Sequence, residues 1–122
     1  INFEVKSRSE KFQDNAYEVV LTLTVEAKVE EETAFLVEVQ QAGVFACANM
    51  EPQQLEQVLS SLCPNILFPY AREAIDNLTL KGGFPALHIA QVNFDALYLE
   101  ALRKQQEGGQ GQDLAQDPEI TH

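Results

Sequence analysis

Hydrophobic and polar residues alternate along the first part of the chain, most clearly over residues 17–28. One side of this run is almost entirely apolar, and only Val20 breaks the pattern on the other side. A period of two is typical of a β-strand that buries one face and leaves the other in water. The residues that we expect to be buried are Tyr17, Val19, Leu21, Leu23, Val25 and Ala27.

The same alternation predicts two more strands, one over residues 1–6 and one from about Thr33 to Cys47. Polar, turn-forming residues fill 7–15, and three consecutive glutamates occupy 30–32. We therefore predict three antiparallel strands joined by polar turns. Gly43 inside the third strand indicates a bulge or a close approach of another element.

The hydrophobic period lengthens to that of a helix after Pro52, which suits a first helical turn. Gly82 and Gly83 are expected to end a second helix, and Asn93 to cap a third. The three apolar stripes are Leu55, Val58, Leu59 and Leu62; Leu67, Ala71, Ala74, Ile75 and Leu78; and Phe94, Leu97, Tyr98, Ala101 and Leu102.

Two prolines, Pro64 and Pro69, bracket a run of large apolar residues before the second helix. Proline fixes φ and lacks a backbone donor, so we expect stiff, irregular backbone here that presents Ile66, Phe68 and Tyr70. Two interpretations stay open at this point. The run is either a helix start that docks on the core or the wall of an apolar groove.

Residues 1–104 are predicted to form one domain, with a short extended segment over 86–90. The stretch 105–122 is rich in Gln, Gly and Asp, and we expect it to be a disordered tail. The chain begins with Ile1 rather than Met, inside a strand pattern, so we expect a piece that lacks its natural N-terminus.

Charge narrows the classes of partner, because 19 acidic residues against 8 basic ones give a net charge of −11. This balance argues against nucleic acid and against anionic lipid, and it favours basic or apolar ligands. No apolar run approaches the length of a membrane span. With only two cysteines, the expected location is the reducing cytoplasm.

Candidate catalytic residues are few. The histidines are His88 and the terminal His122, and the cysteines are Cys47 and Cys63. Their spacing matches neither a zinc site nor a catalytic triad, and no glycine-rich phosphate loop precedes a helix. We therefore expect a protein that is not an enzyme and that binds no cofactor. An enzyme that depends on His88 or Cys63 is kept as an alternative.

Four segments resemble the SecB family of bacterial protein-export chaperones, in the order and spacing of that family. The strongest match is the run from Cys63 to Glu73, Cys-Pro-Asn-Ile-Leu-Phe-Pro-Tyr-Ala-Arg-Glu; the others are 17–21, 34–43 and 92–98. Two features depart from the family. Its first strand is missing here, together with acidic positions that engage the motor SecA, and Gln91 stands where a proline is usual.

The resemblance implies an α+β fold, with a Greek-key-like antiparallel sheet of four strands packed with two main helices. It also implies a homotetramer, arranged as a dimer of dimers, that holds unfolded preproteins without ATP and delivers them to SecA. The zinc in that partnership belongs to the C-terminal tail of SecA. A dedicated SecB-like chaperone of a toxin–antitoxin pair is the alternative function.

The resemblance also assigns roles to residues of the third strand. Leu36 and Glu38 match positions that contact SecA, and Val37, Val39 and Gln41 match positions of the oligomer interface. An aromatic-walled groove would bind the client. Its candidate residues are Ile66, Phe68, Tyr70, Phe84, Phe94 and Tyr98.

Overall fold

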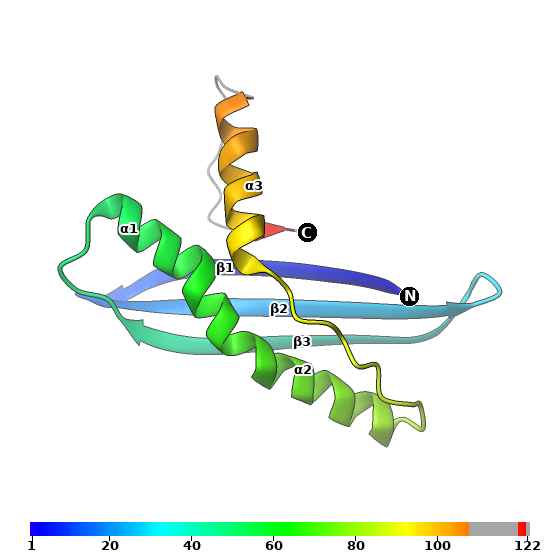
Figure 1. Cartoon of the computed structure of the whole chain (residues 1–122). Coiled ribbons are helices and arrows are strands. Elements are labelled where there is room, and N and C mark those ends of the chain that lie inside the picture. Colours follow the sequence, from blue (N-terminus) through cyan, green and yellow to red (C-terminus); the bar gives the residue numbers. More distant parts are fainter. Residues whose placement is uncertain (108–119, 122) are drawn as a thin grey trace.

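The computed structural model describes residues 1–107, 120 and 121. Three long antiparallel strands follow one another as a meander: β1 (Asn2–Gln13), β2 (Ala16–Val29) and β3 (Glu32–Ala46). The two-residue strand β4 (Ile120–Thr121) pairs with the free side of β1, which gives the sheet order β3-β2-β1-β4. Figure 1 shows the long strands side by side, with α2 crossing one face of the sheet.

The first strand is twice as long as its alternation predicted, because β1 continues through the polar residues to Gln13. The prediction of a polar loop over 7–15 was therefore wrong for most of that stretch. Residues such as Arg8 and Glu10 lie opposite Val20 and Glu18 of β2, so their backbone belongs to the ladder. Polar side chains do not prevent this pairing where the strand face is in contact with water.

The helical part begins at Pro52, as predicted, and continues without a break to Lys81. It consists of α1 (Pro52–Gln57), a wide π-helical turn η1 (Val58–Leu62) and α2 (Cys63–Lys81). The predicted irregular backbone between Pro64 and Pro69 is wrong. At Pro64 the wide turn explains the difference, because the N–H of Cys63 bonds to the carbonyl of Val58 just before this proline, where an ordinary helical turn would need a donor that proline lacks. Pro69 lies inside α2, and the helix continues through it.

Both expected boundaries of the later helices are confirmed. Gly82 ends α2, and Gly83 follows with a φ of +90°, a left-handed conformation that glycine adopts without strain. At α3 (Phe94–Glu107), the side chain of Asn93 accepts a hydrogen bond of 3.0 Å from the N–H of Ala96. The helix runs three residues past the predicted domain boundary at 104. The disordered tail stays a prediction, since 108–119 and 122 lie outside the described residues.

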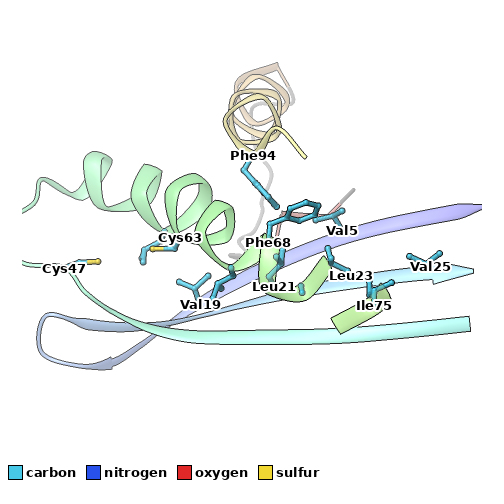
Figure 2. Packing of buried hydrophobic residues seen from close by; sticks show 13 residues of the cluster. Val5, Val19, Leu21, Leu23, Val25, Cys47, Cys63, Phe68, Ile75 and Phe94 are labelled. Carbon is cyan, nitrogen blue, oxygen red and sulfur yellow. The ribbon is translucent and has the colours of Figure 1, made fainter. Parts of the chain in front are cut away.

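The hydrophobic core lies between the inner face of the sheet and α2. Phe68 of α2 is fully buried and packs edge-on against Phe94 of α3, with their ring centroids 5.9 Å apart. Figure 2 shows both rings over the strand residues Val5, Leu21 and Leu23. These packed layers confirm the α+β fold.

Gly43 of β3 confirms the expected close approach. A Cβ atom at this position would lie 3.1 Å from Leu67 of α2 and 3.2 Å from the ring of Phe45. A larger side chain would press on both neighbours, so Gly43 helps α2 to lie close to the sheet.

Candidate functional site

The six predicted groove residues do not share one surface. Phe68, Phe94 and Tyr98 are 0, 3 and 6% exposed, so they belong to the core or its margin. Phe84 is half-buried, with its ring centroid 4.6 Å from that of Phe35 in β3. Ile66 and Tyr70 are exposed on α2.

Ile66 and Tyr70 belong to an apolar ridge that we call the outer ridge, which also includes Leu62. The three residues are spaced four apart along the helix, and they are 52, 46 and 60% exposed in the order Leu62, Ile66 and Tyr70. Residues four apart lie one above the other on a helix, so these side chains form one continuous stripe. The ridge faces away from the core that the opposite side of α2 covers.

A second feature is the linker, residues 82–93, which joins α2 to α3 and runs back alongside α2 (Figure 1). Near its start, the N–H of Phe84 bonds to the carbonyl of Thr79 at 2.9 Å. Further along, the N–H of Leu87 reaches the carboxylate of Asp76 at 3.3 Å. The linker therefore follows the helix in the antiparallel sense.

The contacts continue towards the start of α2 in the same order. Arg72 donates to the carbonyl of Ile89 at 3.4 Å, and the side-chain amide of Gln91 donates to that of Asn65 at 3.0 Å. The guanidinium of Arg72 also lies 5.2 Å from the ring centroid of Phe68, in a cation–π arrangement. Gln91, which departs from the family pattern, is thus the linker's last attachment to α2.

The helix residues that hold the linker and the start of α3 were not predicted from the sequence. Ser61, Asn65, Arg72 and Asp76 are spaced by four, seven and four residues, which places them on one stripe of the helix. Ser61 is buried and donates to the carboxylate of Asp95 at the start of α3. The sequence signal that could have revealed them is the regular spacing of these polar residues in a largely apolar helix.

The underside of the linker is apolar. Leu87, Ile89 and Val92 are partly buried and pack against the core cluster. His88 between them is exposed and has a φ of +55°, which is uncommon for a residue other than glycine. The predicted extended segment over 86–90 is therefore interrupted at His88.

The outer face of the sheet carries the two predicted SecA contacts. Leu36 is 64% exposed, and the exposed Glu38 accepts a hydrogen bond of 3.2 Å from Thr24. The strand register adds two carboxylates that sequence reasoning missed, because Glu26 lies opposite Leu36, and Glu4 lies opposite Thr24. We call Glu4, Glu26, Leu36 and Glu38 the outer-face patch.

Glu26 of the outer-face patch has a pKa below the usual value for a glutamate. Its carboxylate accepts a hydrogen bond of 2.8 Å from the hydroxyl of Thr33. This bond lowers the pKa of Glu26, and the nearby charge of Lys28 adds to the effect. The carboxylate is thus held in its charged form on the sheet surface.

The three predicted interface residues face the other way. Val37 and Val39 are partly buried and pack against the core beneath α2, and Gln41 lies on the same strand face. In the single chain these side chains therefore support the packing of helix on sheet. Their role in assembly stays a prediction.

The two cysteines are free thiols inside the core. Burial raises the pKa of Cys63 to about 12, and the neighbouring Cys47 adds to the shift. A thiol that stays protonated is a poor nucleophile, so Cys63 does not fit the role of a catalytic residue. Within the described residues, no three His, Cys, Asp or Glu side chains are grouped closely enough to hold a metal ion. None of the helices described here has the length and apolar content needed to cross a bilayer.

Comparison with known proteins identifies the family of this chain. The family described as SecB, preprotein translocase subunit SecB, matches residues 1–105. The protein-export protein SecB of Hahella chejuensis is 57% identical over 106 residues, which cover 87% of this chain and 67% of that protein. The proteins of the same name from Marinobacter nauticus and Pseudomonas syringae are 54% and 50% identical over 112 and 110 residues. These matches cover 92% and 90% of this chain, and 68% and 67% of the relatives. The chain belongs to the SecB family.

Proposed function

We propose that the chain serves protein export as a chaperone that holds unfolded preproteins without ATP and passes them to the motor SecA. Family membership supports the export role, since the relatives are named protein-export proteins. The observation that carries the holding role is the outer ridge. Leu62, Ile66 and Tyr70 are apolar, contiguous and about half exposed, so they are available for contact with a client.

The physical basis of holding is the burial of apolar surface. An unfolded client exposes apolar side chains, and covering them contributes about 25 cal/mol per Å² of apolar area without demanding one sequence. A helix ridge offers such contacts and few directional ones. In the homotetramer that we propose, several ridges would raise the effective concentration of each later contact with the same client.

Delivery to SecA is proposed to use the outer-face patch, on the opposite side of the sheet from α2. Leu36 offers an exposed apolar contact, with Glu26 opposite it on β2 and Glu38 two residues further along β3. Glu4 on β1, opposite Thr24, adds a third carboxylate to the same face. This combination suits a zinc-bound segment of SecA that carries Lys and Arg. The net charge of −11 would also steer a basic segment towards the protein.

The client surface and the SecA surface are thereby separated by the sheet. A client on α2 and a SecA tail on the outer-face patch need not compete for the same residues. We further propose that this exchange takes place in the cytoplasm, where preproteins are held before export. The chain would then act as a passive binding protein rather than as an enzyme.

The test is suppression of aggregation. A reduced, unfolded protein is diluted into buffer with about a fourfold molar excess of this chain, which supplies about one tetramer per client molecule. We expect light scattering to fall in the absence of ATP, and to be unaffected when ATP is added. Aggregation at the rate of the client alone, with circular dichroism showing a folded chain, would overturn the proposed function.

A further inference from the structure

The meander of long strands has two outer strands, β1 and β3, and they differ in charge. β1 has 12 residues and β3 has 15, and the outward side of each carries backbone N–H and C=O groups that no other long strand uses. Such an edge is a template for pairing with an extended segment. β3 contains no lysine or arginine, whereas β1 contains Lys6, Arg8 and Lys11, three of the eight basic residues of the chain. The edge of β1 therefore favours a segment with carboxylates.

Lys6 and Arg8 are the basic residues of β1 whose charge is available to such a segment. Both lie on the outer face of the sheet, where Arg8 is exposed and Lys6 is half-buried. Among the described residues, neither of them makes an ion pair, whereas Lys11 lies 3.7 Å from the carboxylate of Asp14. A ligand carboxylate at this edge would thus meet two cations that are not already paired.

The edge of β1 is occupied at one place by the strand β4. Thr121 lies opposite Lys6, and Ile120 lies opposite Ser7, in antiparallel pairing (Figure 1). All four charged residues between Lys104 and this strand are acidic, namely Glu107, Asp113, Asp117 and Glu119. The chain therefore pairs the end of an acidic sequence with the strand that has the most basic residues.

Reach alone does not explain why β4 pairs with β1 rather than with β3. Twelve residues, 108–119, separate the end of α3 from β4. A chain of that length spans up to roughly 40 Å, whereas two strand spacings separate the edges of β1 and β3 by only about 10 Å. Either edge is within this span, so charge is the difference that favours β1.

We propose that the edge of β1 is a binding site for acidic extended segments, and that β4 is its resident occupant. Backbone pairing with β1 supplies affinity, and Lys6 and Arg8 select a segment that carries carboxylates. An acidic extended segment of another polypeptide competes with β4 for the same edge. This surface is separate from the outer ridge, and the inference does not depend on the proposed holding of clients.

The first test locates the last residue of the sequence on the full chain. His122→Cys is labelled with bimane, a dye that tryptophan quenches at short range; the chain has no tryptophan, and its two native cysteines are buried. Tryptophan is introduced by Glu4→Trp on β1 or by the matched Glu38→Trp on β3, two exposed positions level with Thr24 of β2. We expect at least about twofold stronger quenching by Glu4→Trp, since β4 stays mostly on β1. Equal quenching from the two edges would overturn the proposal.

The second test reverses the charges in the Glu4→Trp background. Lys6→Glu with Arg8→Glu should reduce quenching to the level of an unattached segment, because attraction is replaced by repulsion. Adding Asp117→Lys with Glu119→Lys should restore it. A restored signal separates charge selection from a general loss of structure, and circular dichroism checks that each variant is folded. Quenching that is unchanged by the first pair, or not restored by the second, contradicts selection by charge.

A control for the change in net charge uses basic residues outside β1. Lys28→Glu with Lys81→Glu alters the net charge by the same amount at two exposed positions. Quenching in the Glu4→Trp background should stay within the error of the measurement. A loss as large as that caused by Lys6→Glu with Arg8→Glu would attribute the effect to the total charge and would refute a site on β1.

The third test supplies an acidic segment from outside and leaves the edge unmutated apart from Glu4→Trp. A peptide with the sequence of residues 112–122 is added to the labelled chain. Millimolar peptide is needed, because a tethered occupant has an effective concentration on the order of 1 mM. We expect the peptide to lower the quenching at least about twofold by displacing β4, whereas a peptide with Asn for Asp and Gln for Glu should have no effect at the same ionic strength. Equal effects of the two peptides, or no effect of either, would show that this edge is not a site for acidic segments.

Discussion

Two sides of the helix α2 carry large apolar residues, yet these residues differ in burial. On the inner face, Phe68, Ala71 and Ile75 are fully buried against the sheet. On the outer face, Ile66 and Tyr70 of the same helix are about half exposed. Single exposed apolar side chains are normal on a protein surface, whereas a contiguous group of them is typical of a binding surface. The comparison therefore separates residues that hold the fold from residues available for binding.

The largest expected effect is on the inner face. Phe68→Ala removes a fully buried ring that contacts Phe94 and lies under the guanidinium of Arg72. We expect a loss of about 3–5 kcal/mol in the free energy of unfolding, because the surrounding side chains can fill the cavity only in part. Urea unfolding followed by circular dichroism measures it. A loss below about 1 kcal/mol would contradict the fully buried position of this ring.

Raising the pH should also disturb the inner face, at Cys63. Its pKa in the folded chain is about 12, whereas an exposed thiol titrates at about 8.5. The raised value means that the stability contribution is complete below about pH 8.5 and declines as the pH rises towards 12. Native Cys63 should resist iodoacetamide at pH 9 and react once the chain is unfolded in urea, as seen by mass spectrometry. Rapid labelling of the native chain would contradict its burial.

The other exposed region, the outer-face patch, should respond in binding rather than in stability. Glu38→Lys replaces attraction with repulsion and should weaken binding of the zinc-loaded SecA tail peptide by about threefold to tenfold at low salt. Glu18→Lys is the matched control, with the same charge change at the far end of the outer face, opposite Val44. Titration calorimetry measures the affinity of each variant for the peptide. Equal affinities of the two variants would leave Glu38 without a docking role, while wild-type affinity should fall as salt is added.

The sheet and the helix boundaries could be predicted from the sequence because their signals are local. Alternation marked β2 and β3, and Gly82 and Asn93 marked helix ends, since each depends on residues within one turn or strand. The prediction for the backbone between Pro64 and Pro69 was wrong, and the reason is also local. The expectation of irregular backbone did not allow for the wide turn before Pro64, which removes the conflict with helix geometry at that proline, or for a helix that continues through Pro69.

The site could be predicted only in part, because its contacts join distant residues. Asp76 and Leu87 are eleven residues apart, and Asn65 and Gln91 are twenty-six apart, so neither pair shows itself in a local pattern. Glu4 joins the outer-face patch through the register of β1 and β2, and Glu26 joins it through the register of β2 and β3, so each depends on a turn between strands. The split of the six groove candidates into buried and exposed residues likewise depends on the packing of α2.

The most direct test of the central claim compares two pairs of exposed apolar residues on the same helix. Ile66→Ser with Tyr70→Ser removes most of the outer ridge, and Leu78→Ser with Leu80→Ser removes two residues of similar exposure near the end of α2. Unfolding free energies should change by less than about 1 kcal/mol in both, since all four side chains are exposed.

Aggregation of a reduced client is then measured with each variant at equal concentration, and sedimentation reports the assembly state. We expect the ridge variant to lose most of its ability to suppress aggregation, while the control pair and the wild-type chain suppress it equally. Full suppression by the ridge variant would contradict the assignment of the outer ridge to client binding. A ridge variant that sediments as a smaller species would contradict it as well, by assigning the ridge to assembly.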